Sequence, residues 1–207
     1  MTAAFRTGSA TRYAVLAFIA LLAAACGGRQ VSRIDPSAVT DLSGRWNDTD
    51  SRLVANELIR SSLGETWLRQ YSESNAGAAP VVIVGDFRNT TLEHIPVGTF
   101  IGDLERAFVN SGAVRVVASP TDRAEVRDER RDQQDNARAD TRVPMSQETG
   151  ARYMLQGDIV AIEDREGRER VVFYQVDATL IDLQSNEKVW VGQHKIKKYI
   201  EQARLRM

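Results

Sequence analysis

The strongest constraint on the fold is a run of three long β-rich segments near the end of the chain, separated only by short polar turns. The segments cover residues 153–162, 171–183 and 188–200, with the turn sequences "REGRE" and "QSNE" between them. Such segments, rich in valine, isoleucine and aromatic residues, are typical of β-strands. Because turns this short join antiparallel neighbours, we expect residues 153–200 to form an antiparallel meander.

A strand–helix–strand pattern comes before the meander. The β-branched run "PVVIVGDFRN" (residues 80–89) predicts a buried strand, in which Gly85 marks a bulge or a close contact. The segment "AVRVVAS" (residues 113–119) predicts a second strand after a helix that ends at Gly112. Helical spacing between the strands is carried by Phe100, Ile101, Leu104, Phe108 and Val109. This βαβ pattern implies parallel pairing with a right-handed crossover.

The two halves together predict an α/β fold with a single mixed β-sheet, in which a βαβ half is joined to an antiparallel meander and flanked by helices. One further helix is expected upstream, because Ala55, Ile59, Leu63, Trp67 and Tyr71 recur every four residues. A short capped helix is expected at Ser146–Thr149.

The segment Thr121–Arg142 is the most charged part of the chain, with acids and arginines interspersed and almost no apolar side chains. Interspersed charge of this kind predicts a solvated helix that buries little surface. It leaves open a second interpretation, in which the segment is a face for a protein partner.

The N-terminus has the features of an export signal. Arg6 and Arg12 precede the apolar run "AVLAFIALLAAAC", which is too short to span a bilayer as a helix and suits the apolar core of a signal peptide. Three alanines lead directly into Cys26, the only cysteine in the chain. We expect residues 1–25 to be a lipoprotein signal peptide and Cys26 to be the lipid attachment site, with ordinary secretion after the "AAA" sequence as the alternative.

Residues 26–40 are expected to be the lipidated cysteine and a flexible tether, because the segment is polar, contains Pro36 and has no sustained period. Stretched out, the segment Gly27–Thr40 reaches at most about 50 Å, and as a flexible coil about 20 Å. Gly27 and Gly28 follow the cysteine where an aspartate would retain a lipoprotein at the inner membrane, so the expected location is the outer membrane, with the domain of residues 41–207 facing the periplasm.

The charge and the motif content exclude several functions. The formal net charge is −1, which gives no basic surface for a nucleic acid. The two histidines, His94 and His194, are far apart and have no cysteine or second histidine at a metal-binding spacing. No nucleotide-binding or nucleophile-elbow motif is present, so we expect neither a cofactor nor catalysis.

The stretch "DLSGRWNDTDSR" (residues 41–52) looks at first like a cation-binding loop. In an EF-hand spacing, however, Gly44 comes too early and Arg52 stands where the last carboxylate should be. The short polar residues from Asn47 to Asp50 instead suit the N-terminal cap of the first helix, with Trp46 close enough for a staple-like contact on its apolar face. A recognition role for Trp46 is the second interpretation.

Two surfaces are candidates for binding a partner. The segment "RNTTLEH" (residues 88–94) follows the first strand at its carboxyl end, where open α/β sheets tend to place their ligands, and it offers Asn89, Thr90 and His94. The alternative is that its polar side chains merely cap the following helix. The second candidate is the basic tail "HKIKKYIEQARLR" (residues 194–206), for which a solvated chain end is the alternative.

Several long strings resemble those of the LpoB family, outer-membrane lipoproteins that activate penicillin-binding proteins. They are "VVIVGDFRNTTLEHIPVGTFIGDLERAFVNSGAVRVVAS", "RDERRDQQDNA", "QETGARYMLQGDI" and "VVFYQVDATLIDLQSNEKVWVGQHKIKKYI". The resemblance covers the chain from "DLSGRWNDTDSRLVA" onward. It implies a fold similar to the N-terminal domain of TolB, and a regulator that binds a bifunctional peptidoglycan synthase and stimulates it.

One feature departs from the family pattern. The enterobacterial activator carries a long proline-rich tether, whereas this chain offers only residues 26–40. Either the synthase extends outward, the periplasm is narrow at that place, or the partner is a different protein. A non-catalytic accessory role in an outer-membrane export or assembly complex, as in relatives similar to CsgG, is the alternative function.

Overall fold

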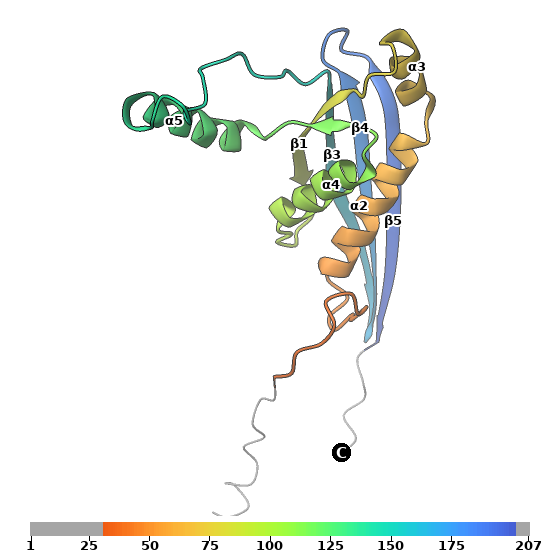
Figure 1. The fold of residues 1–207 in the computed structure, drawn as a ribbon. Helices are drawn as coiled ribbons and strands as arrows, with labels where there is room; N and C mark the ends of the chain where they lie inside the picture. The colour runs from red at the N-terminus through yellow and green to blue at the C-terminus, as the bar shows by residue number, and fades with distance from the viewer. Residues whose placement is uncertain (1–30, 202–207) are drawn as a thin grey trace, which may run out of the picture. The chain divides into compact units, whose positions relative to one another are not determined.

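The computed structural model describes residues 31–201, in which one five-stranded sheet carries helices α2 and α4 packed against it (Figure 1). The strand order is β2-β1-β3-β4-β5, with β1 parallel to β2 and β3, and with β3, β4 and β5 antiparallel. The predicted α/β class with a single mixed sheet is therefore confirmed. In chain order the elements are α2 (Asp48–Leu63), α3 (Thr66–Ser74), β1 (Val81–Asn89), α4 (Val97–Ser111), β2 (Arg115–Val116), α5 (Pro120–Asn136), β3 (Tyr153–Glu166), β4 (Glu169–Asp182) and β5 (Lys188–Glu201).

The expected meander forms as long strands with tight turns. Strands β3 and β4 pair from Tyr153 opposite Asp182 to Glu166 opposite Glu169, and Gly167 takes a positive φ of 56° in the turn between them. Along β4 every second residue from Val172 to Asp182 is buried, so one face of this strand lies in the core.

The bulge expected at Gly85 is present, and it decides which side chains of β1 face the core. The register of β1 on β3 shifts between Val84 and Phe87. Because of the inserted residue, Phe87 joins the same buried cluster as Val82 and Val84, although strict alternation would turn it to the other face. The ring of Phe87 then packs edge-on against Phe100 of α4, with centroids 5.1 Å apart.

The single helix expected over Ala55–Tyr71 is instead two helices. Helix α2 ends at Leu63 and α3 begins at Thr66. Gly64 lies at the break, as the C-cap of α2. Glycine disfavours a continuous helix, because in a helix interior it costs about 1 kcal/mol relative to alanine. The indole Nε1 of Trp67 donates to the carbonyl oxygen of Ser62 at 2.7 Å. Trp67 is therefore buried in the core although it lies on a second helix.

Two other expectations are wrong in detail. The second strand of the βαβ unit, expected over residues 113–119, pairs only at Arg115–Val116, because Ser119 already accepts from the backbone of Asp122 as the N-cap of α5. No helix forms at Ser146–Thr149.

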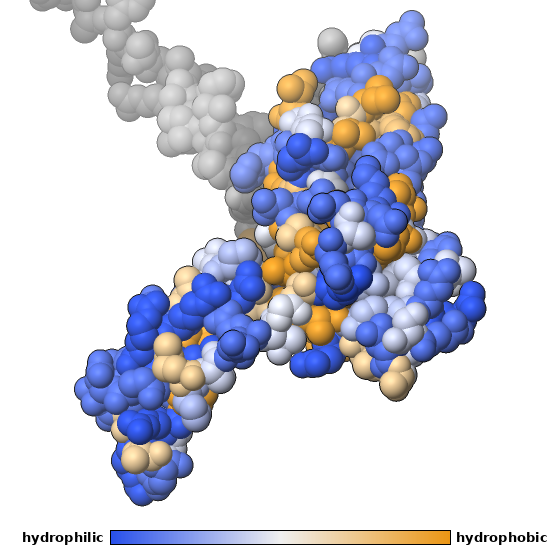
Figure 2. All heavy atoms as spheres, turned by 90° about the horizontal axis from the view of Figure 1, so that it is seen from above, coloured by the Kyte–Doolittle hydropathy of each residue, from blue (hydrophilic) through white to orange (hydrophobic). Residues whose placement is uncertain are grey.

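Helix α5 matches the solvated helix expected from the charged segment. None of its residues is buried, and its surface in Figure 2 is mostly hydrophilic. The extended segment that follows is fixed to α5 at two points. Gln133 Oε1 accepts from the backbone N–H of Val143 at 3.0 Å, and Glu148 pairs with Arg127 at 2.7 Å. Glu148, where a helix was expected, is therefore tied to α5 in a segment without regular secondary structure.

Candidate functional site

The loop that follows β1 is ordered by its own polar side chains. Asn89 Oδ1 accepts from the backbone N–H of Thr91 at 3.0 Å, and Asn89 Nδ2 donates to the carbonyl oxygen of Glu93 at 2.7 Å. Thr90 Oγ1 donates to the carbonyl oxygen of Ile159 in β3 at 3.0 Å. We call residues 89–95 the β1 loop. The alternative that these side chains cap the next helix is wrong, since Pro96 precedes α4 and makes no capping side-chain bond.

Glu93 joins the β1 loop to two distant parts of the chain. Its Oε1 accepts from the backbone N–H of Trp46 at 2.9 Å, and its Oε2 accepts from the hydroxyl of Tyr174 in β4 at 2.5 Å. Burial, together with the hydrogen bond to this carboxylate, raises the pKa of Tyr174 well above its ordinary value, so the phenol stays a donor. The loop is therefore held in place by bonds to groups outside it.

Trp46 lies in the core beneath this loop and is only 8% exposed. Its ring packs edge-on against Phe100 at 6.0 Å and against Tyr174 at 5.6 Å between centroids. Its Nε1 donates to Ser51 Oγ at 2.8 Å. Asn47, the first of the four residues expected to cap the helix, is its N-cap and forms a capping box with Asp50. Because Trp46 is buried, its ring is not part of the exposed surface beside the β1 loop.

A groove of about 450 Å³ opens beside the β1 loop. Among the residues that line it, Leu92 is fully exposed and His94 is exposed, while Arg170 pairs with Glu163 at 2.9 Å. The lining residues come from the β1 loop, from Arg45 and from strands β3 and β4: Arg45, Thr91, Leu92, Glu93, His94, Ala161, Glu163, Arg170, Val172 and Tyr174. The exposed apolar side chain of Leu92, next to charged side chains of both signs, suits contact with a protein surface.

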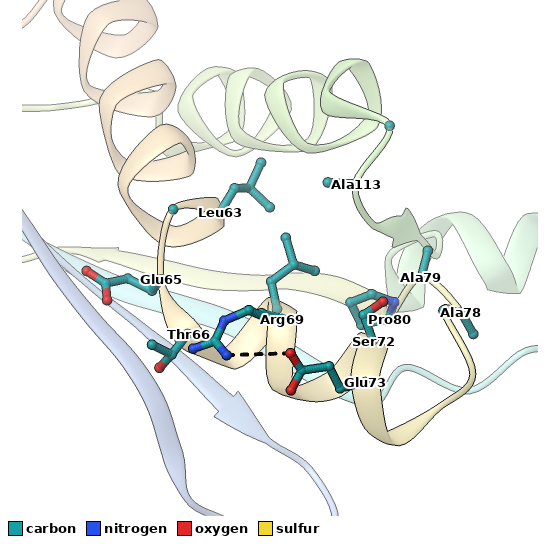
Figure 3. A pocket seen from close by; sticks show the side chains of 14 residues that line it. Leu63, Glu65, Thr66, Arg69, Ser72, Glu73, Ala78, Ala79, Pro80 and Ala113 are labelled. Carbon is teal, nitrogen blue, oxygen red and sulfur yellow. Dashed lines mark hydrogen bonds and ion pairs between the residues drawn. The ribbon is translucent and has the colours of Figure 1, made fainter.

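A larger groove, of about 750 Å³, lies between the end of α2, helix α3 and the segments that flank β1 and α4 (Figure 3). Leu63, Pro80 and several alanines line it, and its one side-chain ion pair is Arg69 with Glu73 at 3.5 Å. Both members of this pair are well exposed, so they contribute little to binding or to stability. Most of the polar side chains that line this groove belong to α3: Thr66, Arg69, Ser72 and Glu73.

The second predicted surface, the basic tail, is divided by the pleat of β5. Lys195 and Lys197 are exposed, whereas the side chain of Lys198 is 9% exposed and turned toward residues 41–50. Cys26 and the last residues of the tail lie outside the described residues, and the predictions on them stay predictions.

The structure therefore brings Trp46, Asn89, Thr90 and His94 together around the β1 loop. Sequence reasoning missed Glu93, Tyr174 and Arg170. Glu93 stands inside the string "RNTTLEH", but its bonding partners are 47 and 81 residues away. The one local signal was a lone acid in a polar turn.

Among residues 31–201, no group of three or more His, Cys, Asp and Glu side chains is placed to hold a metal ion. Within the same residues, no helix combines the length and the apolar character needed to cross a bilayer.

Comparison with known proteins gives one family and several solved structures. The model of the family described as "Peptidoglycan-synthase activator LpoB" matches residues 50–196. The LpoB C-terminal domain from Escherichia coli is 16% identical, with 72% of this chain and 99% of that chain covered and a TM-score of 0.45. The lipoprotein GNA1162 from Neisseria meningitidis is 18% identical, with coverages of 58% and 83% and a TM-score of 0.35. No curated protein gives a significant match.

Proposed function

This chain belongs to the LpoB family of peptidoglycan-synthase activators, and from this membership we propose that it binds a bifunctional peptidoglycan synthase, a penicillin-binding protein, and activates it. The observation that carries the proposal is the family match over residues 50–196, which includes the whole β1 loop and all of β3 and β4. The protein acts by binding and performs no chemistry of its own, in keeping with the family's description as activators.

The β1 loop is the proposed contact surface for the synthase. Its exposed side chains, Leu92 and His94, stand on a backbone that Asn89 and Glu93 already hold in one conformation. A pre-ordered loop loses less conformational entropy on binding than a flexible one, so more of the contact energy appears as affinity. Leu92 is the natural anchor, since a fully exposed leucine gains most from burial in a partner.

A substitution at Leu92 tests this surface. In an assay of glycan polymerisation by the purified synthase of the same organism, the wild-type chain is expected to raise the rate. In a separate binding measurement, Leu92→Asp is expected to weaken the affinity for the synthase about tenfold or more. The physical reason is that the aspartate carries a charge into a contact that the leucine made apolar. Affinity is measured by titrating the chain onto the immobilised synthase.

The matched control for Leu92→Asp is Val109→Asp. Val109 is also an exposed apolar residue, 58% exposed on α4, and lies outside the β1 loop. This variant should bind and activate like the wild type. An unchanged polymerisation rate with no detectable complex for the wild type would refute the proposed activity, whereas equal losses in both variants would refute the assigned surface.

We also propose that a lipid on Cys26 anchors the chain in the outer membrane, facing the periplasm. Cys26→Ala is expected to remove the protein from the outer-membrane fraction, because the acyl chains that hold it there have no other attachment thiol. Fractionation and the mass of the N-terminal peptide measure this, with Gly27→Ala as the control that should stay membrane-bound. An unmodified Cys26 in the wild type, or an N-terminus elsewhere, would contradict the anchor.

The alternative role in an export or assembly complex is not favoured by the family match. This alternative can be tested by purifying the lipidated protein from membranes: it predicts that secretion proteins, and no synthase, purify with it.

A further inference from the structure

The last strand of the sheet and the first residues of the folded domain are joined by a buried lysine. Lys198 Nζ in β5 donates to Asp41 Oδ1 at 2.6 Å, to Asp50 Oδ2 at 2.6 Å and to the carbonyl oxygen of Arg45 at 3.1 Å. All three ammonium protons therefore have acceptors. We call the three side chains Asp41, Asp50 and Lys198 the clasp. Its lysine is 9% exposed and its Asp50 is 7% exposed, so solvent screens this part of the contact weakly.

The pKa values of Asp41 and Lys198 both shift in the direction that favours an ion pair. The hydrogen bond from Lys198 lowers the pKa of Asp41 below its ordinary value. Burial works against the charge of Lys198, but its hydrogen bonds to Asp41 and Asp50 outweigh this and raise its pKa. Both members of the Asp41–Lys198 pair are thus ionised at neutral pH.

Residues 41–47, which we call the strap, also fit β5 closely by shape. Gly44 is buried and has a φ of +68°, and a Cβ added there would lie 2.3 Å from Ile200 Cδ1. Only glycine adopts this conformation readily and leaves room for the isoleucine. Within the strap, Asn47 Nδ2 donates to Asp41 Oδ1 at 2.7 Å. The strap is therefore seated against the end of β5 by charge and by packing.

The far end of the strap carries the contact that fixes the β1 loop. The backbone N–H of Trp46 donates to Glu93 Oε1, and the carbonyl oxygen of Glu93 accepts from Asn89 Nδ2. A continuous chain of bonded groups thus runs from Lys198 through the strap and Glu93 to the loop. Asp41 and Lys198 lie outside residues 50–196, so the family match does not describe this connection.

We propose that the strap is a positioning element, which couples the point where the tether joins the domain to the order of the β1 loop. While the clasp is closed, Trp46 is held where its N–H meets Glu93, and the loop keeps the conformation offered to the partner. When the strap leaves β5, Glu93 loses a donor and the loop becomes mobile. A mobile loop should then bind the synthase more weakly, and only this last consequence rests on the proposed function.

Hydrogen–deuterium exchange on the full-length chain in detergent tests the coupling. Lys198→Met keeps the aliphatic length but removes the charge, and it is expected to speed amide exchange about tenfold in residues 41–47 and also in residues 89–95. Lys188→Met is the control, since Lys188 is exposed on the same strand and outside the clasp. It should leave both segments unchanged. Faster exchange in the strap with an unchanged β1 loop would overturn the proposal, as would no change in either segment.

Coupling between two sites is reciprocal, which supplies a second arm. Glu93→Gln should speed exchange in residues 41–47 by a similar factor, and a strap that stays protected would also overturn the proposal. If Lys198→Met speeds exchange throughout the chain, Asp41→Ala gives the same readout with the Asp50–Lys198 pair intact.

On the immobilised synthase, Lys198→Met should bind about fivefold or more weakly than Lys188→Met. If the wild type binds no synthase, the exchange results still decide the coupling and only the proposed function fails.

Discussion

Replacing Trp46 by alanine is expected to lower the free energy of unfolding by about 3–5 kcal/mol, the range for a large aromatic residue removed from a core. The ring contacts Phe100 and Tyr174, and its Nε1 donates to Ser51. The variant leaves a cavity and removes the indole N–H that donates to the Ser51 hydroxyl. Urea denaturation followed by far-ultraviolet circular dichroism measures the loss without relying on tryptophan fluorescence.

Leu92→Ala provides the contrast for this substitution. Leu92 is fully exposed and packs against nothing that a shorter side chain would leave empty, so its variant should change stability by less than about 0.5 kcal/mol. The pair separates the two interpretations of Trp46 made from the sequence. If Trp46→Ala unfolds like the wild type, the residue contributes little to the core and a direct recognition role returns.

The sequence was most informative where the determinants are local. Asn47 is the N-cap of α2, as expected for the segment from Asn47 to Asp50, and the structure adds a capping box between Asn47 and Asp50. Trp46 precedes the cap as expected, but the residue that a staple would contact in the first turn is Ser51, and the indole makes a hydrogen bond there while its ring packs against Phe100. The position of Trp46 was predictable from spacing, whereas its neighbours depend on the tertiary fold.

The place of the β1 loop at the end of the first strand was predictable, but the contacts that order it were not. The β1 loop follows from the rule that ligands gather at the carboxyl ends of parallel strands. Glu93 and Tyr174 could not be paired in advance, because their contact depends on the register of β4 in the sheet and on the seating of the strap. In the sequence, Lys198 is one of several cations in a basic tail. The pleat of β5 places its side chain on the opposite face of the strand from the exposed side chains of Lys197 and Tyr199.

The bulge in β1 shows how a local signal acquires a distant role. Gly85 marked an irregularity in the strand, but the sequence did not say which face the next residues would take. The structure turns Phe87 into the core, and there its ring crosses over Gly157 of β3. Gly157 was an ordinary residue of a predicted strand, and it is in fact the position that makes room for the bulge.

Gly157→Ala is accordingly expected to destabilise the fold by about 3 kcal/mol, the upper end of the usual cost of overpacking. A Cβ at this position would lie 2.1 Å from the carbonyl oxygen of Asp177 and 2.5 Å from Cε1 of Phe87. The oxygen belongs to the backbone of β4 and cannot move without disturbing the β3–β4 ladder. The ring cannot retreat freely either, since it packs against Phe100. Chemical denaturation of the variant and the wild type measures the difference.

The same glycine-to-alanine change at Gly102 is the matched control, and its expected sign is opposite. Gly102 lies inside α4, where an added Cβ meets no atom within 4 Å. Alanine is favoured over glycine in a helix interior by about 1 kcal/mol, so Gly102→Ala should stabilise the protein by up to that amount. A Gly157→Ala variant as stable as Gly102→Ala would mean that β3 and Phe87 separate easily. The bulge would then not fix which face of β1 Phe87 occupies, just before the β1 loop begins.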